Sequence, residues 1–295
     1  MSPKDCLLDA LFCYHARLGH DTLIMTPPSV LIFDSGAGGL SIAAEIRTLL
    51  PTLPIHYLMD DAAFPYGQSQ DEWLSKRIVS ICTAAQQRIN ASILVVACNT
   101  ASTLVLDKLR KNLTIPVVGV VPAIKTAARL TQTGEIGLLA TPATIKRPYT
   151  RQLIQDFASH CQVRLKGSVE LVHWAEFYMA NGQVAEALFE HLDEWITRPL
   201  PLSHVVLGCT HFPLLRQELE KRWPETIWID SGAAIARRVS YCLAQQGYAI
   251  PTSGCDTYLW WTSDQPQHAI IQNYLESLGP VRSSLALSNT SAEHR

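Results

Sequence analysis

The stretch VLIFDSGAGGLSIAAEIRTLL (30–50) contains a complete strand, turn and helix unit. Its first five residues, VLIFD, form a short apolar run that is typical of a strand buried on both faces. The polar, glycine-rich turn DSGAGG (34–39) follows, and helical spacing of apolar residues then continues to Leu50. A strand that leads directly into a helix is the building unit of a parallel sheet covered by helices, so this stretch predicts an α/β fold.

The same alternation continues along the chain. Longer helical patterns separate further short apolar runs, with Pro or Gly at most joints. These runs predict strands at 55–60, 93–97, 116–120, 135–140, 204–208 and 226–230. The pattern therefore predicts doubly wound parallel sheets.

Two internal echoes predict that the chain holds two similar lobes. VVACNT (95–100) and VVLGCT (205–210) each run from a strand into a cysteine, and FDSGA (33–37) returns as IDSGA (229–233). Chance repetition is the alternative interpretation. Because open parallel sheets bind ligands at the carboxyl ends of their strands, two lobes in a pseudo-two-fold relation would place Cys98 and Cys209 across one cleft.

This interpretation divides the chain into four parts. Residues 1–28 are expected to be an N-terminal extension, and residues 29–98 with about 209–265 the first lobe. Residues 99–208 are expected to form the second lobe. The aperiodic end, 279–295, is expected to be mobile.

The composition excludes several classes of protein. Of the 295 residues, 17% are charged and 47% are apolar, as in a globular chain. The net charge of −2, without long runs of one sign, disfavours a nucleic-acid surface. Apolar windows are too short for a transmembrane helix, and Asp9, His15 and Arg17 interrupt the apolar start that could suggest a signal peptide. Eight cysteines without zinc-like spacing predict free thiols in a reducing cytoplasm and no metal site.

The turn DSGAGGLS (34–41) matches a dinucleotide fingerprint only weakly, because Ser41 occupies the place of the third glycine. Two interpretations are open. The glycines could let backbone amides approach a small anion at the helix start, or Asp34 could simply be the N-cap of the helix.

Two cysteines lie where helix starts and polar neighbours favour a thiolate. Cys98 precedes Asn99 and Thr100, and Cys209 precedes Thr210 and His211. A free thiol has a pKa of about 8.5, so it needs such help to act as a base near neutral pH. A hydrolase triad of Cys209, His211 and a carboxylate leaves Cys98 without a role. Two matching thiols suit removal and return of a proton on opposite faces of one carbon.

Seven segments carry a resemblance to a known family: VLIFDSGAGGLS, AFPYGQ, VVACNTAST, PVVGVVPAI, TPATIKRPYT, VVLGCTHFPLL and DSGAAIARR. From about Val30 to Gln246 the chain resembles the glutamate racemases of the cofactor-independent aspartate/glutamate racemase superfamily, and within them the proteobacterial branch. The resemblance implies racemisation of L- and D-glutamate without a cofactor or metal, and a supply of D-glutamate for peptidoglycan synthesis.

The resemblance also implies residue roles. Cys98 acts on the D-enantiomer and Cys209 on the L-enantiomer, assisted by Asp34 and His211 respectively, with Glu176 helping on the His211 side. Thr141 and Thr144 are further candidates for contact with the substrate. The residues expected to hold glutamate are Asp34, Ser35, Tyr66, Gly67, Asn99, Thr100, Thr210 and His211.

Several alternatives remain open at this point. A pyridoxal enzyme would need a Schiff-base lysine, for which Lys125 and Lys146 are the best-placed candidates. The fold also suits an aspartate racemase or another superfamily enzyme, although decarboxylase relatives keep only one cysteine. A non-catalytic regulator of a partner such as DNA gyrase is the rival from another class. Some members of the branch carry an N-terminal extension and are activated by a muramoyl-alanine nucleotide, a hypothesis that residues 1–28 raise here.

Overall fold

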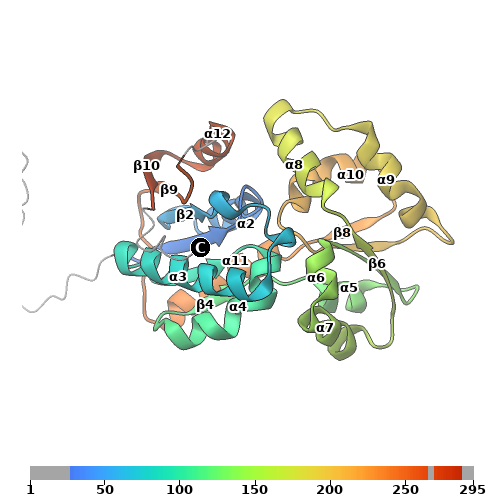
Figure 1. The fold of residues 1–295 in the computed structure, drawn as a ribbon, viewed down its shortest axis with the longest axis horizontal. Helices are drawn as coiled ribbons and strands as arrows, with labels where there is room; N and C mark the ends of the chain where they lie inside the picture. The colour runs from blue at the N-terminus through green and yellow to red at the C-terminus, as the bar shows by residue number, and fades with distance from the viewer. Residues whose placement is uncertain (1–26, 265–268, 288–295) are drawn as a thin grey trace, which may run out of the picture.

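The computed structural model describes residues 27–264 and 269–287, which form two α/β lobes lying side by side (Figure 1). The expected N-terminal extension lies, apart from its last two residues, outside the described residues. Each lobe has its own parallel sheet, so the predicted α/β class with two lobes is confirmed. No helix in the described ranges is long and apolar enough to cross a membrane.

The larger sheet has six parallel strands in the order β10-β9-β2-β1-β3-β4. Val30 and Ile32 of β1 enter one apolar core, while Leu31 and Phe33 enter the other, and all four are fully buried. Both faces of the sheet are therefore covered, as the apolar run predicted. The strands are β1 (Val30–Asp34), β2 (Ile55–Met59), β3 (Ile93–Val96), β4 (Val117–Gly119), β9 (Thr257–Trp261) and β10 (Val281–Ala286).

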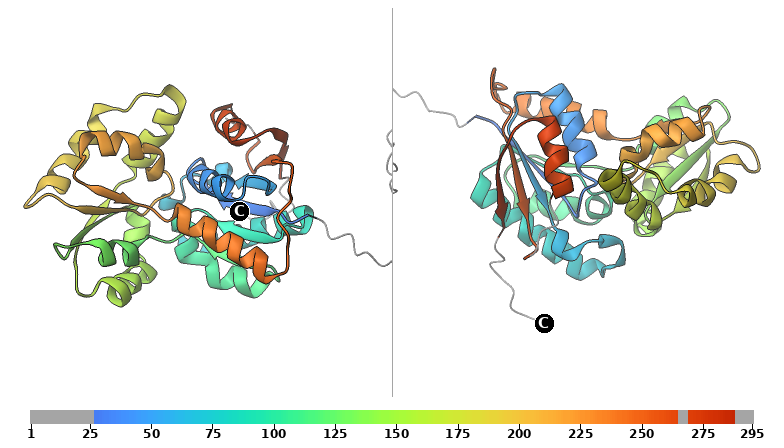
Figure 2. Two further views of the ribbon diagram at one scale, coloured as in Figure 1. Left: turned by 180° about the vertical axis from the view of Figure 1, so that it is seen from behind. Right: turned by 90° about the horizontal axis from the view of Figure 1, so that it is seen from above.

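Helices cover the two faces of this sheet in separate groups. One core lies under α2 (Leu40–Leu49), α11 (Gly232–Gln245) and α12 (Ala269–Leu278), and α12 packs beside α2 (Figure 2). The other lies under α3 (Asp71–Ile89) and α4 (Asn99–Asn112). Between β2 and α3 the chain makes two short 3-10 turns, η1 (Asp61–Ala63) and η2 (Tyr66–Gln68).

The smaller sheet has four parallel strands in the order β6-β5-β7-β8. Its strands are β5 (Glu135–Ala140), β6 (Gln162–Gly167), β7 (His204–Leu207) and β8 (Ile227–Ile229). One face is covered by α8 (Glu170–Asn181), α9 (Glu186–Thr197), η3 (Phe212–Leu215) and α10 (Arg216–Arg222). The other is covered by α5 (Ile124–Leu130), α6 (Pro142–Lys146) and α7 (Pro148–Ala158).

The structure confirms all seven predicted strands and adds β6, β9 and β10. β6 and β10 are edge strands, which need only one row of backbone hydrogen bonds and can therefore be polar. β6 reads QVRLKG and has no fully buried residue, so it lacks the apolar run that marks a central strand. β10 lies within 279–295, so the expectation that this whole segment is mobile is wrong for Val281–Ala286.

The lobe boundaries also differ from the prediction. β4 pairs with β3 in the larger sheet, and β8 pairs with β7 in the smaller one. The chain therefore crosses between lobes after β4 and again after β8, one strand later than the boundaries drawn at the two cysteines. At this double crossing Ser231 donates a hydrogen bond of 2.5 Å to the carbonyl of Val121.

Only one of the two sequence echoes relates equivalent positions. The orders β2-β1-β3-β4 and β6-β5-β7-β8 correspond strand for strand, so Cys98 after β3 and Cys209 after β7 are equivalent. FDSGA follows β1, whereas IDSGA follows β8, the counterpart of β4. The second echo therefore marks similar strand-to-helix turns at different places in the two sheets.

Candidate active site

The carboxyl ends of β1 and β3 from the larger lobe and of β7 from the smaller lobe meet between the lobes. They carry Asp34, Cys98 and Cys209. Each cysteine is only 7% exposed. The charge of Cys209 raises the pKa of Cys98, so the two thiols are near enough to interact electrostatically. The structure thus brings the two predicted cysteines into one site.

Asp34 joins the two lobes. Its fully buried carboxylate accepts hydrogen bonds from the Gly36 amide (2.9 Å) and the Ser35 hydroxyl (3.4 Å) at Oδ1. Its Oδ2 accepts a hydrogen bond of 3.1 Å from the Thr210 hydroxyl of the opposite lobe. Burial raises the pKa of Asp34, although the charge of His211 and these hydrogen bonds act in the other direction.

The N-cap of α2 is Gly39 without a side-chain cap, so the interpretation of Asp34 as the N-cap is wrong.

The surroundings of Cys98 favour its neutral thiol. Its sulfur lies 3.7 Å from the Ser35 hydroxyl, which also contacts Asp34. Burial, followed by the charge of Asp34, raises the pKa of Cys98 to about 12, and a hydrogen bond from the Ala101 amide is too weak to reverse this. The expected preference for a thiolate at this helix start is therefore outweighed, and Cys98 is protonated at neutral pH.

Cys209 lies beside a histidine, whereas Cys98 lies near a carboxylate. The sulfur of Cys209 lies 3.9 Å from Nδ1 of His211, and Nε2 of the same ring lies 3.2 Å from the Glu176 carboxylate. Burial lowers the pKa of His211, but its hydrogen bonds to Cys209 and Glu176 outweigh burial and raise it to about 10. His211 is therefore a cation at neutral pH, and its ring lies beside the Cys209 sulfur.

Hydrogen-bond donors line the same region at the start of α4. Thr100 Oγ1 lies 3.2 Å from Thr141 Oγ1 and 3.4 Å from Thr144 Oγ1, so three hydroxyl groups meet across the lobes. The buried side-chain amide nitrogen of Asn99 has no hydrogen-bond partner among the described residues. A buried, unpaired donor costs free energy, and an acidic ligand would satisfy it.

Two other predicted site residues lie on η2. The Tyr66 side chain is buried, and its hydroxyl donates to Asp60 at 2.6 Å rather than to Cys98 or Cys209. Gly67 is exposed, and a Cβ placed on it would meet nothing within 4 Å. Open space therefore adjoins the backbone of this turn.

Sequence reasoning missed several residues that shape the site. A Cβ on Gly38 would lie 2.4 Å from His211 Nδ1 and 2.6 Å from Thr210 Oγ1, so only glycine lets the lobes approach this closely. Tyr57 donates to the Gly36 carbonyl at 2.6 Å, and Ser41 donates to the Thr210 carbonyl at 2.9 Å. The glycine pattern of the turn was a usable signal for close approach, but its partner in the other lobe was not visible in the sequence.

Side chains elsewhere in the chain argue against the alternative chemistries. Lys125 and Lys146, the candidates for a Schiff base, are both exposed, and Lys125 lies over the ring of Phe157 at 4.9 Å. Within the described ranges, no group of three or more His, Cys, Asp or Glu side chains is arranged to hold a metal ion.

Comparison with known proteins identifies the family of the chain. Residues 40–239 match the Asp/Glu/Hydantoin racemase family. The chain is 54% identical over 221 residues to the glutamate racemase of Salmonella gallinarum, covering 74% of this chain and 78% of that protein. The glutamate racemase of Klebsiella pneumoniae is 53% identical over 221 residues, again covering 74% of this chain and 78% of that protein.

Solved structures show the same relationship. The crystal structure of Escherichia coli glutamate racemase in complex with L-glutamate and the activator UDP-MurNAc-Ala matches with a TM-score of 0.81 and 45% identity, over 88% of this chain and 99% of that one. Isoform RacE1 of glutamate racemase from Bacillus anthracis matches with a TM-score of 0.73 and 25% identity, over 88% and 97%. The two-lobed fold and these relatives define an isomerase. The chain belongs to the Asp/Glu/Hydantoin racemase family.

Gly38→Ala tests whether close approach of the lobes is required. The added methyl group would collide with His211 and Thr210, so we expect racemase kcat/KM to fall by about a hundredfold while the circular dichroism spectrum of the fold is unchanged. Gly167→Ala in β6 is the control, because its nearest contacts, at 3.3 Å, are much less severe. Unchanged kcat/KM in Gly38→Ala would contradict this account.

Proposed function

We propose that this protein interconverts L- and D-glutamate without a cofactor, with Cys98 and Cys209 as the two bases. The observation that carries the proposal is the opposite electrostatic environment of the two thiols, one beside a buried carboxylate and one beside a buried imidazolium. Inversion at one carbon by two bases needs a base on one face and an acid on the other. The identity to glutamate racemases and the L-glutamate in the Escherichia coli structure support glutamate as the substrate.

The geometry suggests how the reaction starts from L-glutamate. The Cys209 thiolate, stabilised by His211, removes the α-proton, and Glu176 keeps the imidazole oriented. The Cys98 thiol then gives a proton to the opposite face of the carbanion. The products are D-glutamate, a Cys209 thiol and a Cys98 thiolate.

Asp34 provides a route for the reverse direction. Starting from D-glutamate, Cys98 must first become a thiolate. The Ser35 hydroxyl contacts both the Cys98 sulfur and the Asp34 carboxylate, and burial raises the pKa of Asp34, so this carboxylate can accept the proton. The His211 imidazolium in turn gives its proton to Cys209, so that the Cys209 thiol can protonate the opposite face of the carbanion. Asp34 and His211 thus serve opposite thiols, as the resemblance implies.

The α-proton of an amino acid is a very weak acid, so the developing negative charge needs placed donors in a site with little water. The free Asn99 amide and the hydroxyl groups of Thr100, Thr141 and Thr144 are such donors. We assign them to the substrate carboxylates. An aspartate racemase would use the same donors, and the relatives' activity is what favours glutamate.

The cellular role and the compartment of the protein follow from the same reaction. D-glutamate is a building block of peptidoglycan, whose soluble precursors are made in the cytoplasm, where we place the enzyme. Its six described cysteines are all free thiols, which suits that reducing compartment. No contact of the described residues favours a role as a regulator of DNA gyrase.

Single replacements of the two thiols test the proposed function. We expect Cys98→Ala and Cys209→Ala each to abolish racemisation, because either change leaves one face of the substrate without an acid or base. Circular dichroism of the L- and D-forms of glutamate and aspartate measures both rate and specificity. A single variant that still racemises glutamate freely, or a wild-type enzyme that prefers aspartate, would overturn the proposal.

Activation by a precursor is a separate prediction. The Escherichia coli relative was solved with the activator UDP-MurNAc-Ala, and we expect this nucleotide to raise the racemisation rate here as well. The measurement compares rates with and without it for chains starting at Met1 and at Met25. Identical rates under all four conditions would exclude activation.

The pH dependence tests the charge on His211. Its pKa of about 10 predicts that kcat/KM for L-glutamate falls as the pH rises through that value, because the cation beside Cys209 is lost. In His211→Asn the rate should be lower by about a hundredfold, and the remaining descending limb should move towards the pKa of Cys98, about 12. An unchanged descending limb in this variant would show that another group titrates.

A further inference from the structure

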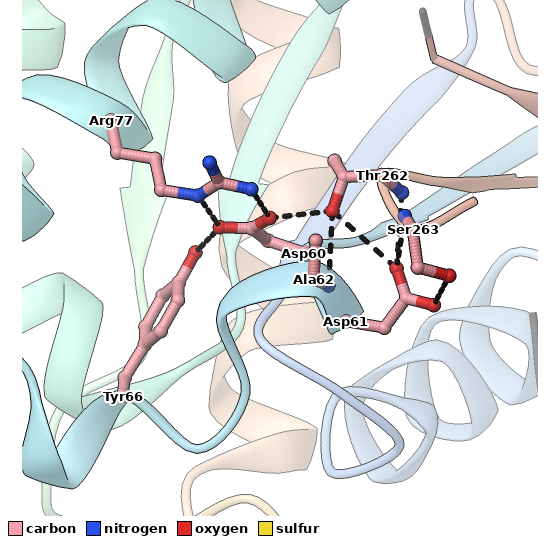
Figure 3. Close-up of polar contacts among 7 residues, drawn as sticks. All are labelled: Asp60, Asp61, Ala62, Tyr66, Arg77, Thr262 and Ser263. Atoms are coloured by element: carbon pink, nitrogen blue, oxygen red, sulfur yellow. Dashed lines mark hydrogen bonds and ion pairs between the residues drawn. The ribbon is translucent and has the colours of Figure 1, made fainter. Parts of the chain in front are cut away.

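Asp60 lies directly after β2, and its fully buried carboxylate is surrounded by donors (Figure 3). Its Oδ2 accepts from the Tyr66 hydroxyl at 2.6 Å and from Arg77 Nε at 2.7 Å. Its Oδ1 accepts from Arg77 Nη2 at 2.5 Å and from the Thr262 hydroxyl at 2.6 Å. These donors come from η2, α3 and the end of β9, so one carboxylate fixes three segments that are distant in sequence.

Asp61 strengthens the connection to the end of β9. Its carboxylate accepts hydrogen bonds of 3.0 Å from the backbone amides of Thr262 and Ser263, and one of 2.5 Å from the Ser263 hydroxyl. In the other direction the Ala62 amide donates to the Thr262 hydroxyl at 3.3 Å (Figure 3). The start of η1 and the end of β9 therefore hold each other through both backbone and side chains.

The segment that this network holds lies against the active site. The ring of Phe64 lies 3.0 Å from where a Cβ of Gly36 would be, and its centroid is 5.9 Å from that of His211. Tyr66 packs in the same apolar core as Cys98, and the charge of Cys98 raises the pKa of Tyr66 after burial and Asp60. The turn η2 also contacts α4 and α6, which carry Thr100 and Thr144.

The hydrogen bond from Tyr66 decides which of its atoms can serve a substrate. A tyrosine hydroxyl has one proton to donate, and here that proton is directed to the buried Asp60 carboxylate. The hydroxyl is therefore not available to a substrate carboxylate. The backbone amides of Tyr66 and Gly67 remain, and the space beside Gly67 is open.

We infer that Asp60 and Thr262 are positioning residues of the racemase. Asp60 holds the Tyr66 hydroxyl away from the substrate and so fixes the Tyr66–Gly67 backbone at the cleft. Thr262 attaches this turn to the end of β9. The inference rests on the proposed function, because it takes the substrate to be glutamate bound at this cleft. It gives a role to the C-terminal part of the larger lobe, whose strands β9 and β10 otherwise lie away from the cysteines.

The same network borders a cavity beside the catalytic side chains. Asp61 and Ser263 line this cavity of about 330 Å³ together with Gly36, Phe64 and Glu176. A loosened network would therefore move the wall of the site on the Glu176 side as well as the turn. Binding of both enantiomers should then weaken together, because the proposed function places both of them at this cleft.

Three near-isosteric variants test the inference. Tyr66→Phe keeps the ring but removes the hydroxyl, and we expect KM for L- and D-glutamate to rise by about tenfold with kcat within about twofold, the pattern of lost uniform binding. Thr262→Val should raise KM by about threefold. Asp60→Asn, which loses the charge that faces Arg77, should have the largest effect on KM.

Coupling between the variants separates positioning from direct contact. If Tyr66 and Thr262 both act through Asp60, adding Tyr66→Phe or Thr262→Val to Asp60→Asn should raise KM by less than the product of the single effects. If instead the Tyr66 hydroxyl binds the substrate, Tyr66→Phe alone would raise KM, Asp60→Asn and Thr262→Val would leave it unchanged, and the inference would be overturned.

Glu135→Gln is the matched structural control. It breaks a similar two-bond pair between Arg164 and Glu135 in the smaller sheet, so it should lower the melting temperature but leave KM at the wild-type value. A wild-type KM in all three test variants would overturn the inference, as would equal KM changes in the control. Absence of glutamate racemisation in the wild-type enzyme would instead contradict the proposed function.

Discussion

The hydrogen bond between Asp34 and Thr210 is the contact on which the rest of the site depends. It crosses from the larger to the smaller lobe, and it forms because Gly38 leaves room for Thr210 and His211. A buried carboxylate is costly unless it is well hydrogen-bonded, so Asp34 favours the arrangement in which the lobes meet. That arrangement also sets the electrostatic environment of both cysteines.

The two lobes contribute equivalent cysteines but inequivalent partners. Cys98 faces a carboxylate and Cys209 faces an imidazolium, although both follow the corresponding strand of their sheets. The asymmetry has a chemical purpose: two identical thiols in identical surroundings would have the same protonation state, whereas racemisation needs one of each.

Much of this could be predicted from the sequence, because central strands and the residues that follow them leave strong local signals. The run VLIFD gave β1, and the paired cysteine segments gave the cleft. Edge strands β6 and β10 escaped, since a polar strand with one neighbour has no apolar pattern. The lobe assignment of β4 and β8, the partner of Gly38 and the Asp60 contact of Tyr66 depend on pairings between distant segments, which a single sequence does not encode locally.

The central claim is that separate thiols act on opposite faces of one carbon. Racemisation of L-glutamate in D₂O, followed by mass spectrometry at low conversion, tests it most directly. The account predicts deuterium at the α-carbon of the D-glutamate formed and almost none in the recovered L-glutamate, because the proton returned to the product comes from Cys98 rather than Cys209. Equal deuterium in recovered substrate and product would show that one base serves both faces, and would contradict the account.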